Sequence, residues 1–434
     1  MIISDIFKIH TFFIFICLFT LVKSVPTCPL TQNDAEEQQK YIIQFSSASA
    51  TKNFSTLLNH CNKTIKTIVD FSNIQSDLKH NGIIQDVSFG NFYAYIGYFG
   101  SSDVDELIKL NGIINVEKDS LMGIHILKNK DSSYGIQTLK DKNSSSCLST
   151  RQNPNPNLDR IDQEHFPLNG EYMYPSTAGN QVKVYILDTG IKTDHDEFGG
   201  RATFGTTICE GCSATDDNGH GTHVAGIVGG QNFGVANQVS LIAVKVCTAN
   251  GTCSTSDVIL GLNYVSTQYS TSYDNKAVIN LSLGGPVSNS FNDAVNSITK
   301  IGIHVVVSAG NNYHDNACNY SPASALSAIT VGATEATSDN ATDFTNIGSC
   351  VSIFAPGRKI LSAGIYNETN ILSGTSQAAP HVTGTIALVI ANTGNLSPSN
   401  MKEFIINLAT KNILTDIDSS TPNNFLRVPY TCNN

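Results

Sequence analysis

Apolar, β-branched runs alternate with helix-like segments between residues 182 and 392, and this alternation is the feature that most constrains the fold. Strands that are apolar along their whole length are buried on both faces, and a helix between two of them makes them parallel neighbours. The sequence therefore predicts an α/β fold, a parallel sheet with helices on both faces. The expected strands are Val182–Leu187, Ser240–Val246, Ala277–Leu283, Ile303–Ser308 and Ala328–Val331, and the expected helices are Gly221–Gly229, Ser254–Gln268, Ser290–Lys300 and Thr375–Asn392.

The chain upstream of this module has another pattern. Residues 40–128 suggest the strands Tyr41–Phe45, Phe92–Phe99 and Ile113–Val116, with a helix at Ser102–Leu110. A polar stretch rich in Ser, Asn and Lys then runs to Asn157, which is linker composition. The length of 434 residues also favours more than one domain. We therefore expect a small α+β domain first, with a boundary between residues 130 and 157.

The N-terminus and the cysteines indicate export. The apolar run Thr11–Val22 follows Lys8 and is too short to span a bilayer, so it predicts a signal peptide cleaved after Ser24. The alternative is a buried N-terminal helix. Eleven cysteines, in even numbers in each downstream part, fit disulfides, and seven N-x-S/T acceptors fit glycosylation. Asn280 also matches that motif but falls in an expected strand, so we expect it to be unmodified.

Composition narrows the partners. The net charge is −10 and only 14% of residues are charged, which disfavours nucleic acid as a partner because phosphate binding needs clustered Lys and Arg. The 41% of apolar residues excludes a disordered chain. No later stretch has the ~20 apolar residues of a membrane helix, so no membrane partner is expected. Cys209 and Cys212 form one C-x-x-C motif, which would be half of a zinc site. How these two cysteines, Cys247 and Cys253 pair in disulfides is left open by the sequence.

Four residues could carry chemistry. Asp188 and Asn311 follow expected strands, at the sheet edge where parallel sheets form their sites. His220 precedes a helix, and Ser376 begins a long apolar helix, where unpaired backbone N–H groups converge. Each alone has a plain alternative: a turn residue, an N-cap or a metal ligand. Asp-Thr-Gly would suit an aspartic protease only with a second copy, and His220 and His223 lack the intervening Glu of a metalloprotease helix.

Their order along the chain is more specific. The segments around Asp188, His220 and Ser376 resemble the three signature blocks of the subtilase family, with Asn311 between the last two. Leu158–Gln163 and the segment 195–201 are similar to its proteinase K-like branch, and the resemblance covers roughly residues 158–430. It implies a serine endopeptidase. His220 would take the proton of Ser376, Asp188 would orient His220, and Asn311 with the Ser376 N–H would bind the oxyanion.

The same resemblance implies a substrate site formed by Ser282, Leu283, Gly284 and Gly251. The residues that match the specificity pocket, Ser282–Gly285, Ser308–Gly310 and Tyr320, are uncharged. We therefore expect cleavage after apolar or aromatic residues rather than processing at basic sites. The partners would be polypeptide substrates, and a monomer is expected. The other reading is an inactive subtilase fold used for binding, which would be expected to have lost at least one of the four candidate residues.

Maturation is also implied by the resemblance. Residues 1–24 would be the signal peptide, and residues 25–146 a self-processed propeptide that inhibits its own chain, with an inhibitor-like domain at about 40–128. Residues 147–434 would be the peptidase, secreted or in the lumen of the secretory pathway. Catalysis would need no cofactor and no metal. A structural calcium ion stays open, because Ser352 stands where a proteinase K-like site has Asp.

Two further points come from the comparison with the family. Gln377 stands where the family usually has Met, beside the expected nucleophile. Cys318 and Cys350 stand where proteinase K-like enzymes form a disulfide, so we expect them to pair.

Overall fold

The computed structural model describes residues 39–49, 52, 82–124, 127–128, 141–143, 147–272, 275–366 and 368–429. The expected signal peptide lies outside the described residues. The chain forms two compact units, Met1–Asp86 with Tyr93–Val116, and Val87–Phe92 with Glu117–Asn434. The structural boundary at residue 116 lies upstream of the expected boundary at residue 146, which concerned processing and stays a prediction.

The first unit is built on a four-stranded sheet of order β2-β3-β1-β4. Its strands are β1 (Gln39–Phe45), β2 (Gly82–Phe89), β3 (Phe92–Phe99) and β4 (Ile113–Lys118), with helix α3 (Ser101–Leu107) between the last two. Strands β1 and β3 are antiparallel, and the side chains of Ile43, Phe45, Tyr95, Phe99 and Leu107 form a small core. The expected strands are confirmed, while the helix ends three residues early.

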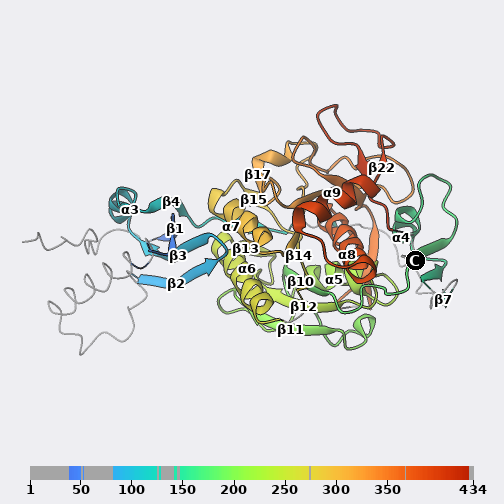
Figure 1. The fold of residues 1–434 in the computed structure, drawn as a ribbon, viewed down its shortest axis with the longest axis horizontal. Coiled ribbons are helices and arrows are strands. Elements are labelled where there is room, and N and C mark those ends of the chain that lie inside the picture. Colours follow the sequence, from blue (N-terminus) through green and yellow to red (C-terminus); the bar gives the residue numbers. More distant parts are fainter. Residues whose placement is uncertain are drawn as a thin grey trace, which may run out of the picture. The chain divides into compact units, whose positions relative to one another are not determined.

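The second unit contains a nine-stranded sheet of order β11-β12-β10-β14-β16-β18-β19-β23-β22 (Figure 1). Every neighbouring pair is parallel except β22 with β23. The predicted parallel sheet is confirmed. Its strands are β10 (Lys183–Asp188), β11 (Ala202–Thr207), β12 (Ser240–Lys245), β14 (Ala277–Leu281), β16 (His304–Ser308), β18 (Ile329–Thr334), β19 (Ile353–Pro356), β22 (Thr410–Lys411) and β23 (Asn424–Phe425).

Helices cover both faces of this sheet, as the sequence predicts. Val184 and Ile186 of β10 belong to the main core cluster, together with side chains of α5 (His220–Gly229) and α8 (Thr375–Thr393). Leu187 instead lies against Gly261 of α6 (Thr255–Ser270), which packs on α7 (Asn289–Lys300). Because successive side chains of a strand point to opposite faces, the pairs α5/α8 and α6/α7 cover opposite faces.

Helix α8 is the central element of the second unit. All its residues from Thr375 to Ile390 are buried, and it packs against α5, β14, β16, β18 and β19. Gly384 of α8 allows a close approach, because a Cβ there would lie 2.6 Å from the Cβ of Val235. The first turn of α8 is therefore held by the core rather than by surface loops.

Smaller sheets complete the unit. They pair β5 (Leu121–Gly123) with β13 (Thr252–Ser254) and β15 (Gly285–Pro286) with β17 (Tyr320–Ser321). In two three-stranded sheets, β21 (Thr369–Ser373) lies between β20 (Ile360–Ala363) and β6 (Leu127–Lys128), and β8 (Leu148–Gln152) lies between β7 (Asp141–Asn143) and β9 (Glu171–Pro175). The remaining helices are α4 (Pro156–Ile161) and α9 (Pro398–Leu408), with 3-10 turns at Asp196–Phe198 and Ala317–Asn319. In the part of the chain that the structure describes, no helix is long and apolar enough to cross a membrane.

The polar stretch before residue 157 is partly folded, so the expected linker does not extend that far. Strand β8 lies within it, and Arg151 of β8 is buried. The Arg151 guanidinium donates to the carbonyl oxygens of Asn232 and Gly234 and lies over the rings of Tyr172 and Tyr174. The polar composition is typical of a linker. It does not show that the charged side chain of Arg151 is buried and hydrogen-bonded.

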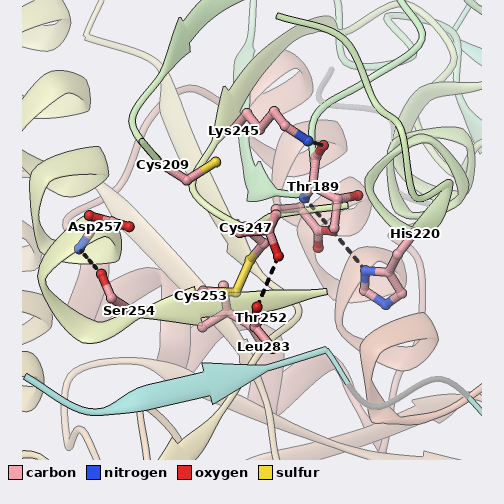
Figure 2. The surroundings of a disulfide bond; sticks show 12 residues. Thr189, Cys209, His220, Lys245, Cys247, Thr252, Cys253, Ser254, Asp257 and Leu283 are labelled. Carbon is pink, nitrogen blue, oxygen red and sulfur yellow. Dashed lines mark hydrogen bonds and ion pairs between the residues drawn. A yellow bond between two sulfur atoms is a disulfide. The ribbon is translucent and has the colours of Figure 1, made fainter. Parts of the chain in front are cut away.

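Three disulfides lie among the described residues. The bond between Cys318 and Cys350, expected from the resemblance, is present. The pairs that the sequence left open are Cys209–Cys212 and Cys247–Cys253 (Figure 2). The C-x-x-C pair therefore forms a disulfide rather than half of a zinc site.

Candidate active site

Asp188 and His220 form a buried pair. Asp188 is the last residue of β10 and His220 the first of α5, and both side chains are fully buried. The Oδ1 atom of Asp188 accepts from Nδ1 of His220 at 2.8 Å and from the N–H of Thr189 at 2.8 Å. A carboxylate beside Nδ1 keeps the proton of the neutral imidazole there, so Nε2 is the acceptor. Among the described residues, Nε2 of His220 has no hydrogen-bond partner.

A second carboxylate fixes the start of α5. The buried Asp216 accepts hydrogen bonds from the hydroxyl of Thr189, from the N–H groups of Asn218 and Gly219, and from the N–H and hydroxyl of Thr222. These donors include N–H groups that a helix start leaves unpaired, and the negative charge suits the positive end of the helix dipole. Asp216 therefore holds the backbone around His220 in place.

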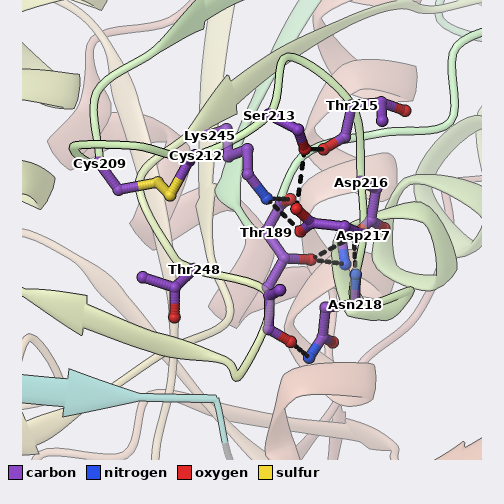
Figure 3. A network of polar contacts seen from close by, with 12 residues as sticks. Thr189, Cys209, Cys212, Ser213, Thr215, Asp216, Asp217, Asn218, Lys245 and Thr248 are labelled. Atoms are coloured by element: carbon purple, nitrogen blue, oxygen red, sulfur yellow. Dashed lines mark hydrogen bonds and ion pairs between the residues drawn. A yellow bond between two sulfur atoms is a disulfide. The ribbon is translucent and has the colours of Figure 1, made fainter.

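A buried lysine completes this network (Figure 3). Nζ of Lys245 donates to the carbonyl oxygen of Thr189 at 2.5 Å and to Asp217 at 2.7 Å. Lys245 is 1% exposed and Asp217 is its charge partner, and this interaction lowers the pKa of Asp217 even though desolvation acts to raise it. Lys245 and Asp216 are not among the residues predicted from the sequence. The signals for them are a lysine inside an apolar strand and two adjacent acids before His220.

Ser376 lies at the start of α8 and is hydrogen-bonded to Ser282. The hydroxyl of Ser376 donates to the carbonyl oxygen of Ser282 at 3.0 Å, and the hydroxyl of Ser282 donates to the carbonyl oxygen of Ser376 at 2.8 Å. In this structure the Ser376 hydroxyl therefore bonds to Ser282 rather than to His220.

A pocket lies beside Ser376, and Asn311 lines it too. The residues that line it are uncharged: Gly123, Leu283, Gly284, Gly285, Ser308, Ala309, Gly310, Asn311, Asn312, Tyr320, Ser321, Ala323, Thr375 and Ser376. Most of the residues expected at the specificity pocket are thus brought together, including Leu283 and Gly284. Ser282 contributes its carbonyl oxygen to Ser376, and Gly251 lies apart, on the hairpin before β13.

A segment of the same unit occupies the neighbourhood of this pocket. Strand β5 pairs with β13, and Gly123 also exchanges two hydrogen bonds with Gly284, at 3.0 and 3.1 Å. The N–H of Ile124 then donates to Gly251 at 3.0 Å. Farther along, Leu127 pairs with Ser373, three residues before Ser376. Residues 121–124 thus pair with β13 and with Gly284, which lines the pocket, and Leu127 pairs with the strand that precedes α8.

The family model described as Subtilase family (Peptidase_S8) matches residues 179–425. This is more than half of the chain. The chain belongs to the subtilase family. The prediction made from the signature blocks is confirmed at this level.

Several relatives of this subtilase are named as serine proteases or proteinases. It is 45% identical over 276 residues to an "Extracellular serine proteinase" of Thermus sp. (strain Rt41A), covering 63% of this chain and 66% of the relative. It is 37% identical over 358 residues to the "Subtilisin-like serine protease pepC" of Aspergillus niger, covering 77% and 63%. It is 38% identical over 367 residues to the "Subtilase-type proteinase psp3" of Schizosaccharomyces pombe, covering 82% and 75%. The chain thus spans slightly less than two thirds of the first two relatives.

A solved structure agrees with the fold. The crystal structure of a cold adapted subtilisin-like serine proteinase matches this subtilase with a TM-score of 0.60 and 38% identity. The match covers 64% of this chain and 99% of the solved chain. The α/β architecture described above is therefore that of a subtilisin-like protein.

Acidic residues anchor the segment before β5 to two helix starts. The carboxylate of Asp119 accepts from the N–H and the hydroxyl of Ser256 in α6, at 2.9 and 2.6 Å. The carboxylate of Glu117 accepts from the N–H of Ser290 in α7 at 3.1 Å. Both are helix N-termini, where acids are favourable. The sequence analysis missed these contacts, because nothing local links residue 119 to residue 256.

Two other histidines near the site are buried and neutral. Burial lowers the pKa of His223 to about 3, and its Nε2 donates to the carbonyl oxygens of Ile360 and Asn370. Burial lowers the pKa of His381 to about 4. Within the described ranges, no group of three or more His, Cys, Asp and Glu is arranged to hold a metal ion.

The two departures from the family pattern are also placed. The hydroxyl of Ser352 accepts from the N–H of Thr330, so this side chain lies within the sheet region. The side chain of Gln377 is fully buried, and neither of its amide atoms has a hydrogen-bond partner in the described part of the subtilase.

Proposed function

We propose that this subtilase is a secreted serine endopeptidase that uses Asp188, His220 and Ser376. The observation that carries the proposal is the buried Asp188–His220 pair, whose imidazole presents Nε2 as an unpaired acceptor among the described atoms. A serine hydroxyl is a poor nucleophile at neutral pH and needs such a base. Ser376 and Asn311 line the same pocket, so a substrate bound there would contact both the nucleophile and an amide donor.

The chemistry follows from these positions. The Ser376 hydroxyl leaves the carbonyl oxygen of Ser282 and donates its proton to Nε2 of His220 as it attacks the peptide carbonyl. The side-chain amide of Asn311 and the N–H of Ser376 stabilise the oxyanion. His220 then protonates the leaving amine, and Asp188 stabilises the imidazolium while the charge exists. Water attacks the acyl-enzyme by the same route.

Specificity follows from the pocket. Its lining residues are uncharged, so a basic side chain would find no counter-charge there. The ring of Tyr320 supplies apolar surface, and its hydroxyl is tied to Asp315 at 2.7 Å. We therefore expect apolar or aromatic side chains on the amino side of the cleaved bond.

The segment 117–128 supports self-processing and self-inhibition. Its residues Leu121–Gly123 pair with β13, Gly123 also pairs with Gly284, and Leu127 and Lys128 pair with β21. A peptide paired with these strands would block the pocket beside Ser376, which Gly123 also lines, to other substrates. We place a first cut between Ile124 and Leu127, upstream of the boundary at residue 146 that the resemblance implies. The N-terminal unit would then remain as an inhibitor until it dissociates.

Export is the remaining part of the proposal. Three disulfides among the described residues need an oxidising compartment, and one relative is named as extracellular.

The test uses a fluorophosphonate probe and the Ser376→Ala variant. The wild-type chain should label at Ser376 and appear at mature size, whereas Ser376→Ala, made in a protease-free host, should neither label nor shorten. A Ser376→Ala chain that reaches mature size would exclude self-processing. A wild-type chain of mature size that does not label would contradict the enzymatic proposal. Ser399→Ala, which removes an exposed serine hydroxyl in α9, is the control and should label and shorten as the wild type does.

A further inference from the structure

Two side-chain interactions close the hairpin between Cys247 and Cys253, and Figure 2 shows one of them, the disulfide. The disulfide is on the buried face, where the two cysteines are 0% and 2% exposed. On the exposed face, the hydroxyls of Thr248 and Thr252 are hydrogen-bonded at 2.9 Å. The backbone adds the bonds from Thr248 N–H to Thr252 and from Gly251 N–H to Thr248, both 2.9 Å. The hairpin is thus closed by hydrogen bonds and, in addition, by a covalent bond.

The root of the hairpin is attached to the proposed catalytic pair. The N–H groups of Val246 and Cys247 both donate to the carbonyl oxygen of Asp188, at 2.9 and 3.1 Å. The amide of Asn218 donates to the carbonyl oxygen of Ala249 at 2.8 Å, and its oxygen accepts from the N–H of His220 at 3.1 Å (Figure 3). The hairpin therefore has a fixed position relative to both residues.

The outer strand of the hairpin binds an extended peptide segment. Leu121, Met122 and Gly123 pair with β13, and Ile124 donates to Gly251. The side chain of Ile124 also packs on the hairpin, since a Cβ on Gly251 would lie 2.5 Å from its Cγ1. An unpaired strand edge recognises a peptide through its backbone, but only if the edge is already straight and ordered.

We infer that the Cys247–Cys253 disulfide strengthens the binding of peptides long enough to reach β13 by keeping the β13 edge preformed. This inference rests on the proposed peptidase function. Without the bond, the exposed turn at Ala249 and Asn250 would have to be ordered each time a peptide binds. That ordering lowers affinity for peptides that reach β13. Peptides that fill only the pocket beside Ser376 do not touch the hairpin and do not depend on it.

The experiment compares two substrates on the mature enzyme. One is an apolar hexapeptide amide long enough to pair with β13, and the other is a blocked single-residue ester that fills only the pocket. For the Cys247→Ser/Cys253→Ser double variant we expect KM for the hexapeptide to rise about tenfold, with kcat within twofold. Both constants for the ester should stay unchanged. Cys209→Ser/Cys212→Ser, which removes another short-range disulfide, is the matched control. It should leave KM and kcat unchanged for both substrates.

The outcomes separate this inference from the proposed function. If no form of the protein labels with fluorophosphonate, the peptidase proposal fails. If the wild type labels but the double variant keeps the wild-type KM for the hexapeptide, or loses ester activity equally, the disulfide has no such role. If the Cys247→Ser/Cys253→Ser variant does not fold, Cys247→Val/Cys253→Ala takes its place, because it keeps apolar side chains at both sites. It should give the same rise in KM for the hexapeptide.

Discussion

The side-chain oxygen of Asn311 accepts two hydrogen bonds from Thr375, one from its N–H at 2.9 Å and one from its hydroxyl at 2.8 Å. Thr375 directly precedes Ser376, so the start of α8 fixes the orientation of the Asn311 amide. The nitrogen end of that amide is then the proposed donor to the oxyanion. The two donors from Thr375 make this orientation specific.

The first prediction follows from this contact. Asn311→Leu should lower kcat by about 10²–10³, the usual effect of losing one oxyanion donor, with little change in KM. Thr375→Val keeps the backbone donor but loses the hydroxyl, so kcat should fall by only about fivefold, as expected for a hydrogen bond worth ~1 kcal/mol. Steady-state kinetics with active-site titration measures both. Equal effects of the two variants would argue against the amide as the donor.

The second prediction concerns activity and pH. The proposed base must be neutral to accept the serine proton, because a protonated imidazole has no free lone pair. We expect kcat/KM on an uncharged peptide to fall along a limb governed by one group as the pH is lowered. The mature enzyme should be measured from pH 4 to 9. Full kcat/KM at pH 4 would contradict His220 as the general base.

The third prediction concerns stability in acid. Nδ1 of His381 donates to the carbonyl oxygen of Gln377 at 2.8 Å, and Nε2 accepts from Asn157 at 2.9 Å, so the folded ring is neutral. Burial lowers the pKa of His381 to about 4 and that of His223 to about 3. The unfolded chain takes up protons near ~6.5, so it binds more protons than the folded chain below that pH. The free energy of unfolding should therefore decrease as pH falls from about 6.5.

Each histidine can contribute a slope of up to ~1.4 kcal/mol per pH unit. Urea unfolding of the Ser376→Ala chain between pH 7 and 4.5 measures the slope. His381→Gln should reduce the slope of the free energy of unfolding against pH by the contribution of one histidine. A slope that His381→Gln leaves unchanged would show that this histidine takes up no proton on unfolding.

The fourth prediction concerns the disulfide Cys318–Cys350, which closes a loop with a sequence separation of 32. Removing it should lower the free energy of unfolding by roughly 3–4 kcal/mol, because the unfolded chain gains loop freedom. Cys318→Ala/Cys350→Ala in the Ser376→Ala background, compared by urea unfolding with Cys209→Ala/Cys212→Ala, tests this. The short loop of the second pair has a sequence separation of 3, so its loss should matter less.

The fifth prediction concerns Gln377. Burying an amide without partners costs about 1–3 kcal/mol, and both amide atoms of Gln377 lack partners among the described residues. Gln377→Leu should therefore raise the free energy of unfolding by about 1–3 kcal/mol and leave fluorophosphonate labelling at Ser376 intact. A destabilised variant would indicate that buried water satisfies the amide, which would then be a structural hydrogen-bonding group.

The core of the fold was predictable because its strands are apolar without interruption. Val182–Leu187 and Ile303–Ser308 were placed within one residue of β10 and β16. Strand β11 was missed because its partly exposed sequence, Ala-Thr-Phe-Gly-Thr-Thr, has no continuous apolar run. Short β19 and β23 were missed too, since a strand of two to four residues has no periodicity to detect.

The candidate site divides in the same way. Asp188, His220, Asn311 and Ser376 stand in short motifs whose order along the chain is specific. Asp216, Lys245 and Asp119 act through contacts with residues distant in sequence, as between Asp119 and Ser256. Composition and periodicity do not encode such contacts, so the structure was needed to find the groups that hold the proposed catalytic residues in place.

The burial of α8 from Thr375 to Ile390 has a consequence for how the molecule loses its function. Segments that open locally are those with few buried contacts, and this helix packs on another helix and six strands. Ser376 cannot be exposed by fraying, so its surroundings should come apart only when the whole unit opens. The half-life of the protein at high temperature should then be set by the rate of global unfolding. The amide hydrogens of this helix should exchange with solvent at that same rate.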